Sequence, residues 1–142
     1  MADTTLLLSG GCRCGAVRYR VAAPASRVVH CHCSICRRLH GAMFGSFAHV
    51  PRAAFRVTQG EGNLRTYKSS PAIERKFCAR CGCHLFVIDD VDFRDVVILA
   101  AASLDNAAHP GHPVDAECHI YVASKAPWFD IADGLPQYDE YD

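Results

Sequence analysis

Short runs of alternating apolar and polar residues recur along the chain. The run from 17 to 21 alternates valine and tyrosine with arginine, and the run from 73 to 77 alternates in a similar way. Alternation with a period of two predicts β-strands that are buried on one face. We expect further strands at 28–30, 55–57, 64–67, 85–88, 96–101 and 119–123, of which 85–88 and 96–101 are apolar on both faces and therefore interior.

Helical signals are scarce. Only the segment 34–40 has the pattern of a short helical turn, and Gly41 ends it. Many short strands at close spacing favour an all-β sandwich or a barrel-like fold. The length of 142 residues predicts a single domain over 1–142, because single domains commonly have about 100–200 residues. The acidic end, 136–142, is expected to be a solvated and fraying tail, with a lid over a substrate as the alternative.

Composition and charge narrow the classes of function. Lys and Arg total 15, as do Asp and Glu, so the strongly basic surface of a nucleic-acid-binding protein is not expected. No leader-like segment and no apolar run of about 20 residues is visible, which predicts a cytoplasmic protein without membrane association. The nine cysteines are an odd number. Since cytoplasmic thiols stay reduced, they indicate metal binding rather than disulfides.

Seven cysteines fall in three clusters at ligand spacing: Cys12 and Cys14; Cys31, Cys33 and Cys36; Cys78 and Cys81. Zinc takes four thiolates in a closed structural site, and three protein ligands with one open position in a catalytic site. Cys14 and Cys81 each precede a glycine, which adopts the positive φ of a tight ligand turn without steric cost. We therefore join the first and third clusters into a structural site and interpret the middle cluster as a catalytic site.

A second grouping of the cysteines stays open. It would place Cys12, Cys14, Cys31 and Cys33 on one metal ion, and Cys36, Cys78, Cys81 and Cys83 on the other. In the first grouping, Cys83 and Cys118 lack a partner at ligand spacing. Those two are then expected to pack as small apolar side chains.

Other side chains near the clusters are weaker candidates. Arg37 and Arg38 directly follow Cys36 and would suit the carboxylates of a substrate, although a solvated basic helix face is the alternative. His32 lies between two ligands, so it should point away from the metal and either support the ligands or be exposed.

Four further predictions concern residues outside the cysteine clusters. His84 and His119 are expected to be hydrogen-bonded core residues. The acidic residues at 89, 90 and 92 are interpreted as a solvated loop, and Trp128-Phe129 is expected to cap the core.

Four stretches of the chain resemble the GFA family, which is named for the glutathione-dependent formaldehyde-activating enzyme and includes centromere protein V. They are GGCRCGAVRYRV, CHCSICRRLHGA, YKSS…RKFCARCG and HIYVASKAPWF, and the resemblance covers about residues 10–138. It implies a mainly β fold, the β-tent of layered antiparallel sheets with zinc knuckles and few short helices. It also implies two zinc ions per chain, a structural one on Cys12, Cys14, Cys78 and Cys81 and a catalytic one on Cys31, Cys33 and Cys36.

The resemblance implies an activity as well, the condensation of formaldehyde with glutathione to S-hydroxymethylglutathione, which is grouped with carbon–sulfur lyases. Three thiolates on a zinc dication leave a net negative charge, which weakens its action as a Lewis acid. We therefore expect the metal to hold the substrate's sulfur, and the partners to be a thiol such as glutathione and a small aldehyde, without nucleic acid.

Two other classes of function are considered. A fourth thiolate, from glutathione, could bind such a metal stably, which suits a non-catalytic glutathione carrier. A zinc module that binds a macromolecule is the other alternative: the family resemblance, which includes centromere protein V, suggests it, whereas the balanced charge of the chain speaks against it. A thiol redox protein acting through Cys33 and Cys36 is disfavoured, because thioredoxin-like motifs require a βαβ context that the strand pattern does not show.

Overall fold

A computed structural model describes residues 7–141; residues 1–6 and 142, which the predicted domain includes, lie outside the described residues. Ten strands and the α-helix α1 (Ser34–His40) make up most of the regular structure in this part of the chain. The strands are β1 (Leu8–Gly11), β2 (Arg18–Val21), β3 (Arg27–Cys31), β4 (Gly45–Pro51), β5 (Phe55–Gln59), β6 (Leu64–Ser70), β7 (Ile73–Cys78), β8 (His84–Asp89), β9 (Val96–Ala100) and β10 (Glu117–Ile120). Short 3-10 helices cover Arg52–Ala54, Glu61–Asn63, Ala101–Ser103, Asp105–Ala107 and Val122–Ser124.

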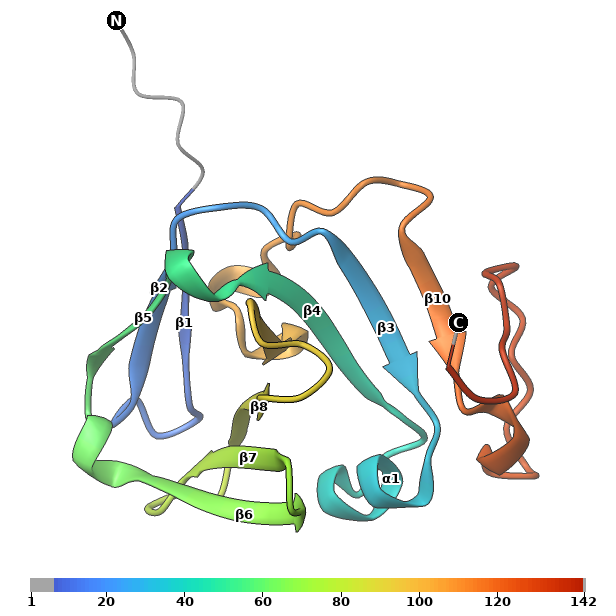
Figure 1. Ribbon diagram of the computed structural model, residues 1–142, viewed down its shortest axis with the longest axis horizontal. Helices are drawn as coiled ribbons and strands as arrows, with labels where there is room; N and C mark the ends of the chain where they lie inside the picture. The colour runs from blue at the N-terminus through green and yellow to red at the C-terminus, as the bar shows by residue number, and fades with distance from the viewer. Residues whose placement is uncertain (1–6, 142) are drawn as a thin grey trace, which may run out of the picture.

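The strands form two sheets. The smaller one has the order β1-β2-β5, and the larger one has the order β10-β3-β4-β9-β8-β7-β6. The described strand pairs are antiparallel except for β10 and β3, which run parallel. Figure 1 shows the small sheet at the left of the molecule, β3 and β10 at the right, and β4 running between them. The expected mainly β architecture of layered sheets with few short helices is confirmed.

The larger sheet buries residues on both of its faces, because successive side chains of a strand point to opposite sides. On one face, Ala48 and Val50 of β4 pack with Tyr19 and Val21 of the small sheet in the main core. On the other face, Phe47 belongs to a second apolar cluster. The larger sheet therefore separates two environments, and each can hold its own site.

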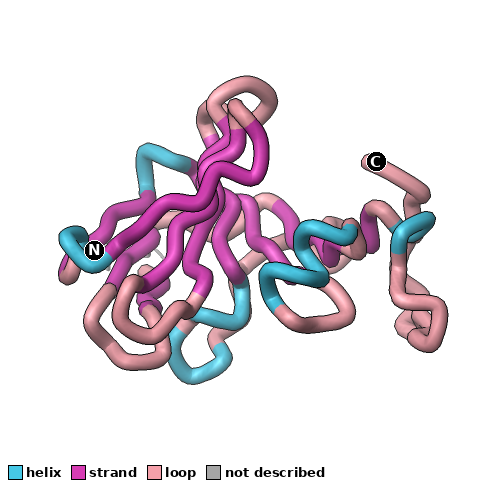
Figure 2. The backbone as a smooth tube through the Cα atoms, turned by 90° about the horizontal axis from the view of Figure 1, so that it is seen from below, coloured by secondary structure: helices cyan, strands magenta, loops and turns pink. Residues whose placement is uncertain are grey.

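Helix α1 begins and ends where the sequence predicts. The sulfur of Cys33 caps its start by accepting a hydrogen bond from the amide of Cys36 at 3.3 Å. Gly41 ends it with a φ of 56°, and its amide donates to the carbonyl of Arg37. In Figure 2 the strands gather into one body, and the helical turns lie at its margins. No helix among residues 7–141 is long and apolar enough to cross a membrane.

Three strand predictions need correction. Two strands, β1 and β4, were not predicted from the sequence. Of these, β4 lies inside the larger sheet between β3 and β9. The strand expected at 119–123 begins at Glu117 and ends at Ile120. It ends there because Tyr121 has a φ of 56°, which no β-strand accommodates.

The C-terminal segment is held along β10, so the expected fraying tail is wrong, although its side chains are exposed. The amide of His119 donates to the carbonyl of Pro136 at 2.9 Å, and the amide of Tyr138 donates back to the carbonyl of His119 at 3.0 Å. The amide of Tyr121 donates to the carbonyl of Glu140 at 2.8 Å. Figure 1 shows this final segment beside β10.

Candidate metal centres

Four cysteine sulfurs meet between the small sheet and β7. The Sγ atoms of Cys12, Cys14, Cys78 and Cys81 all lie within 4.8 Å of one another. Neighbouring sulfurs are 3.6 Å apart in the pair Cys12–Cys14 and 3.8 Å apart in the pair Cys14–Cys78. Thiolates placed about 2.3 Å from a zinc ion in a tetrahedron are separated by about 3.8 Å. The donor set and its spacing therefore fit zinc in a closed site.

Glycine turns shape this four-cysteine cluster. Gly15 and Gly82 have φ values of 82° and 76°, as the sequence predicts for the residues that follow Cys14 and Cys81. A Cβ at either glycine would meet no atom within 4 Å, so the requirement is for the backbone conformation rather than for space. Backbone amides of Cys83 and Cys14 donate to the sulfur of Cys81 and lower its pKa to about 6, which favours the thiolate that a metal needs.

Three further sulfurs meet where β3 leads into α1. The Sγ atoms of Cys31, Cys33 and Cys36 lie within 4.8 Å of one another. Cys31 and Cys36 are buried in the second apolar cluster and Cys33 is half-buried, whereas Cys12 and Cys78 belong to the main core. The side chains thus assemble in the first of the two groupings considered, on opposite faces of the larger sheet. Three sulfur donors fit zinc with one position left for another ligand.

The three thiols of this second cluster differ in acidity. Hydrogen bonds from Cys31 and Cys36, together with those from backbone amides of α1, lower the pKa of Cys33 to about 2. The hydrogen bonds to Cys33 and Cys36 raise the pKa of Cys31, and burial raises it further. Cys33 is therefore the first of the three to be a thiolate at neutral pH, which suits it to initiate metal binding.

A chamber of about 340 Å³ opens beside the three-cysteine cluster. Most of its wall is apolar: Val29, Ile35, Phe47, Ile73, Val87, Phe93, Ile98, Ile120, Tyr121 and Tyr141. The polar lining residues besides the cysteines are His49, Arg75, Asp89 and Asp92. The ring of Tyr141 stacks on that of Phe93 with centroids 5.7 Å apart, so the C-terminal segment forms part of the wall. This contact supports the alternative expectation that the C-terminal segment covers a substrate site.

Arg75 is a site residue that the sequence reading missed. It is buried in the chamber wall on β7, where its Nε donates to Oγ of Ser69 at 2.9 Å and its Nη1 donates to Sγ of Cys36 at 3.7 Å. The signal was present, because Arg75 has the same parity as Ile73 and Phe77 in an alternating run. A charged residue at an inward position of a strand indicates a buried partner.

Arg37 and Arg38 lie outside the chamber. They line a separate surface hollow of about 480 Å³, together with Trp128. The Nε of Arg37 donates to the carbonyls of His32 and Ser124 at 3.3 and 3.1 Å, which ties α1 to the segment after β10. Arg38 is exposed. The proposed role of these arginines in binding substrate stays a prediction.

Trp128 and Phe129 behave differently from each other. Trp128 is 74% exposed, so the expectation that it caps the core is wrong. Phe129 is partly buried, and its ring lies against those of Phe44 and His32. The bend after Ala126 therefore turns only the second aromatic side chain inward.

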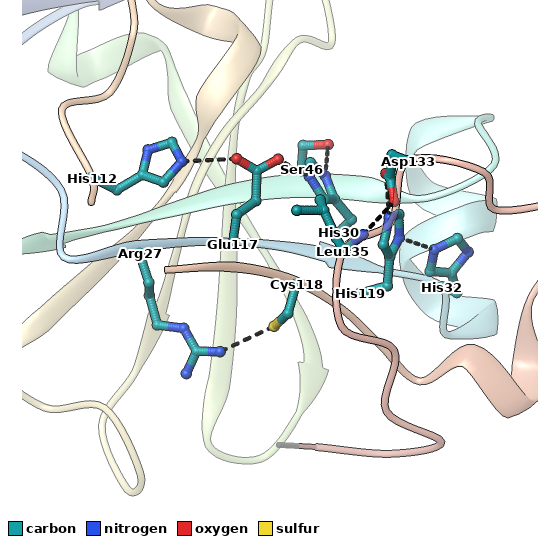
Figure 3. Close-up of polar contacts among 10 residues, drawn as sticks. All are labelled: Arg27, His30, His32, Ser46, His112, Glu117, Cys118, His119, Asp133 and Leu135. Atoms are coloured by element: carbon teal, nitrogen blue, oxygen red, sulfur yellow. Dashed lines mark hydrogen bonds and ion pairs between the residues drawn. The ribbon is translucent and has the colours of Figure 1, made fainter. Parts of the chain in front are cut away.

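His32 is fully buried on the side of β3 opposite to the chamber, so the alternative that it is exposed is wrong. Its Nε2 pairs with Nδ1 of His119 at 2.8 Å, and Nε2 of His119 pairs with Oδ2 of Asp133 at 2.7 Å (Figure 3). His119 is thus a hydrogen-bonded core residue, as predicted. Next to these three hydrogen-bonded side chains, the ring of His30 is hydrogen-bonded to both Ser46 and Glu117. The network supports the backbone of the three-cysteine cluster from behind.

His84 is half-buried rather than fully in the core, and its ring packs 4.7 Å from that of His40. Asp89 is buried, so its interpretation as part of a solvated loop is wrong. Its Oδ1 accepts hydrogen bonds from the amides of Val91 and Asp92, both at 3.0 Å, and so closes the turn after β8.

The remaining two cysteines lie outside both clusters. Cys118 is buried, and Nη2 of Arg27 donates to its sulfur at 3.2 Å (Figure 3). Cys83 is half-buried against the main core, and its thiol donates to the carbonyl of His84 at 3.5 Å. Both therefore act as packing residues, as expected.

Comparison with known proteins places the chain among relatives. A protein of Halomonas elongata is 32% identical over 133 residues, which cover 89% of this chain and 82% of that protein. A protein of Phaeosphaeria nodorum is 36% identical over 58% of this chain, and this match spans only 46% of the fungal protein. The names of both assign them provisionally as glutathione-dependent formaldehyde-activating enzymes.

A solved structure also shares the fold. A crystal structure of a Rhodobacter sphaeroides protein aligns with a TM-score of 0.57 and 28% identity, covering 72% of this chain and 91% of that one. The family model described as glutathione-dependent formaldehyde-activating enzyme matches residues 7–124, a span that contains both cysteine clusters. The chain therefore belongs to the GFA family.

Proposed function

We propose that the protein is a zinc-dependent carbon–sulfur lyase-type enzyme that forms and cleaves the adduct between glutathione and a small aldehyde, formaldehyde in the reaction for which the family is named. One observation carries this proposal: three sulfur donors with room for a further ligand lie at the end of a chamber. The four-cysteine cluster is proposed to hold a second, structural zinc ion.

The reaction is an addition without change of oxidation state. A sulfur–carbon bond forms between the thiol and the carbonyl carbon, while the π electron pair of the C=O bond moves to the oxygen. That oxygen takes up the proton lost by the thiol, and the product is S-hydroxymethylglutathione. The reverse reaction breaks the same bond, so neither an oxidant nor a reductant is needed.

The chain's own residues would prepare the site in three ways. Cys31, Cys33 and Cys36 would hold the zinc ion, which when bound lowers the pKa of a substrate thiol and thereby supplies the nucleophilic thiolate. Arg75 places a positive charge beside Cys36 and offsets the excess negative charge of the thiolates. The apolar chamber wall keeps bulk water away from the reacting sulfur.

Exchange spectroscopy by NMR tests this activity directly. The full chain loaded with zinc is added to ¹³C-formaldehyde and glutathione, and the exchange rate between free formaldehyde and its adduct is measured. The wild-type protein should accelerate the exchange, and Cys33→Ser should abolish the acceleration. The matched control Cys83→Ser changes a cysteine outside both clusters and should retain it. An unaccelerated exchange with both zinc ions bound would refute the proposal.

A glutathione carrier is a second candidate function. A zinc ion held by three thiolates could bind the glutathione thiolate stably as a fourth ligand, and its net negative charge makes it a weak activator of an aldehyde. It would show glutathione binding by calorimetry in the absence of accelerated exchange. The proposed location is the cytoplasm, because reduced thiols are required at both clusters.

A further inference from the structure

We propose that the chamber binds the apolar group of an aldehyde larger than formaldehyde, so that the preferred adduct carries a branched aliphatic or aromatic substituent on the carbon bonded to sulfur. The inference rests on the proposed function and names its substrate class. It follows from the size of the chamber, the chemistry of its wall and its place beside the three cysteines.

The chamber is far larger than formaldehyde requires. Its volume of about 340 Å³ falls within the range of about 300–1,000 Å³ that is typical of small-molecule sites. Formaldehyde has one carbon and one oxygen, and it occupies a space comparable to that of a water molecule, about 30 Å³. A pocket shaped only for that molecule would leave most of this volume without a function.

The wall of the chamber does not suit glutathione. The tripeptide carries two carboxylates and an ammonium group, and each would need a partner if it were removed from water. Among the described residues that line the wall, Arg75 is the only cationic side chain, so at most one of the two carboxylates could find a charged partner there. Its Nε and Nη1 already donate to Ser69 and Cys36. Of the two acidic side chains in the wall, Asp89 accepts hydrogen bonds from two backbone amides, and Asp92 is exposed to solvent. The chamber therefore favours an apolar occupant.

The adduct itself divides naturally between water and the chamber. Its sulfur carries two substituents, the charged tripeptide and the hydroxyalkyl group derived from the aldehyde. The charged substituent belongs at the solvent side, where Cys33 is only half-buried and Ile35 and Tyr141 are partly exposed. The hydroxyalkyl group is then directed inward, among the valine and isoleucine side chains.

Rigid elements build the inner wall. Val87 of β8 and Ile98 of β9 are paired across neighbouring strands of the larger sheet, and both face the chamber. Each methylene group transferred from water to such a wall contributes about 0.8 kcal/mol, which corresponds to a factor of about four in affinity. A larger residue at either position would fill the space that an aldehyde substituent needs.

Stable thioethers test the inference without requiring turnover. S-methylglutathione mimics the formaldehyde adduct, whereas S-(3-methylbutyl)glutathione adds four carbons in a branched chain. Calorimetry with the zinc-loaded full chain should give at least about tenfold tighter binding of the branched thioether. The methyl NMR signals of Val87 and Ile98 should shift only with that ligand.

Variants show whether the gain arises in the chamber. Val87→Phe should reduce the preference to less than about twofold, and Ile98→Phe provides the same test if the first variant does not fold. The matched control Val114→Phe introduces the same ring at a position that is 97% exposed, and it should keep the tenfold preference.

The outcomes separate the two proposals. Equal affinity of wild-type protein for both thioethers, or binding of neither, overturns the inference about the chamber. Neither result affects the formaldehyde exchange measurement, which alone decides the proposed function. Tighter binding of the branched thioether that persists unchanged in both phenylalanine variants also overturns the inference.

Discussion

The guanidinium group of Arg75 donates a hydrogen bond from Nη1 to Sγ of Cys36 over 3.7 Å. The contact joins β7 to the first turn of α1, at a point where both side chains are buried. A zinc ion with three thiolates would carry a net charge of 2 − 3 = −1, and a buried charge requires a partner. Arg75 therefore supplies the compensating cation from a segment distant in the sequence.

Removal of this cation should weaken metal binding at the three-cysteine cluster. Arg75→Met is expected to lower its zinc affinity by about 10–100-fold, the range typical for residues that support metal ligands. Arg75→Lys should restore part of the loss, because it keeps the charge but not the guanidinium geometry. Competition with a chromogenic chelator measures both. The control Arg65→Met removes an exposed arginine and should leave the affinity unchanged, whereas an equal loss in that control would refute the role of Arg75.

The two cysteine clusters should respond differently to substitution. Cys33→Ser is expected to reduce the zinc content from two ions per chain to one while the far-UV circular dichroism stays unchanged. Cys78 is fully buried in the main core, so Cys78→Ser should lower the free energy of unfolding by about 3 kcal/mol or more through loss of the structural metal. Metal analysis and chemical unfolding measure these effects. If Cys33→Ser unfolded the protein and Cys78→Ser left it folded with one zinc ion, the roles proposed for the two clusters would be reversed.

The C-terminal segment should protect the end of β10. A chain that ends at Gly134 loses the backbone partners of His119, Tyr121 and Val122, which Pro136, Glu140 and Tyr138 provide. Hydrogen exchange of those three amides, measured by NMR, should become at least about tenfold faster. Without the C-terminal segment the amides have no hydrogen-bond partner whose release must precede exchange. The amide of Leu99, in the interior of the larger sheet, is the internal reference and should keep its rate. Unchanged exchange at His119 would contradict this assignment.

Stability should fall in mild acid because of His40. Burial lowers its pKa from 6.5 to about 4, and the positive potentials of His84 and Arg75 add to this effect. The unfolded chain therefore binds the proton more tightly, so this contribution to stability is present above pH 6.5 and is lost as the pH falls toward 4.

The variant His40→Phe tests this dependence. It should show a smaller loss of unfolding free energy between pH 7 and pH 5 than the wild type in urea titrations. His109→Phe substitutes an exposed histidine and serves as the control. An identical pH dependence in His40→Phe and wild type would show that His40 does not carry the effect.

The sequence predicts the strands that either alternate between apolar and polar residues or form a continuous apolar run. The alternating run at 73–77 predicted β7, and the continuous apolar runs at 85–88 and 96–101 predicted β8 and β9. β4 gives no such signal, because it is buried on both faces by small or polar residues such as Gly45, Ala48 and His49. Its position is fixed by the strands on either side of it, which a local pattern does not report.

The candidate site likewise has one part that the local sequence predicts and one part that it does not. The grouping of cysteines follows from ligand chemistry and from two glycine turns, so local sequence is sufficient for it. The chamber instead depends on the register of six strands, which brings residues such as Val29, Val87 and Ile120 onto one face. Arg75 and Tyr141 join it only through these distant pairings. The alternation at 73–77 marks Arg75 as an inward-facing residue but does not name its partner, and no spacing in the sequence indicates Tyr141.

The parallel pairing of β10 with β3 sets an order of assembly during synthesis. The four sulfurs of the four-cysteine cluster can meet once Cys81 has been translated. Ile120 must be present to pair with Cys31, and Tyr141 must follow to complete the chamber wall. At about 5–20 residues per second, the interval between these events is about 3–12 s. A nascent chain would thus bring the four-cysteine cluster together first and keep the three-cysteine cluster open to an arriving metal ion until Tyr141 has left the ribosome.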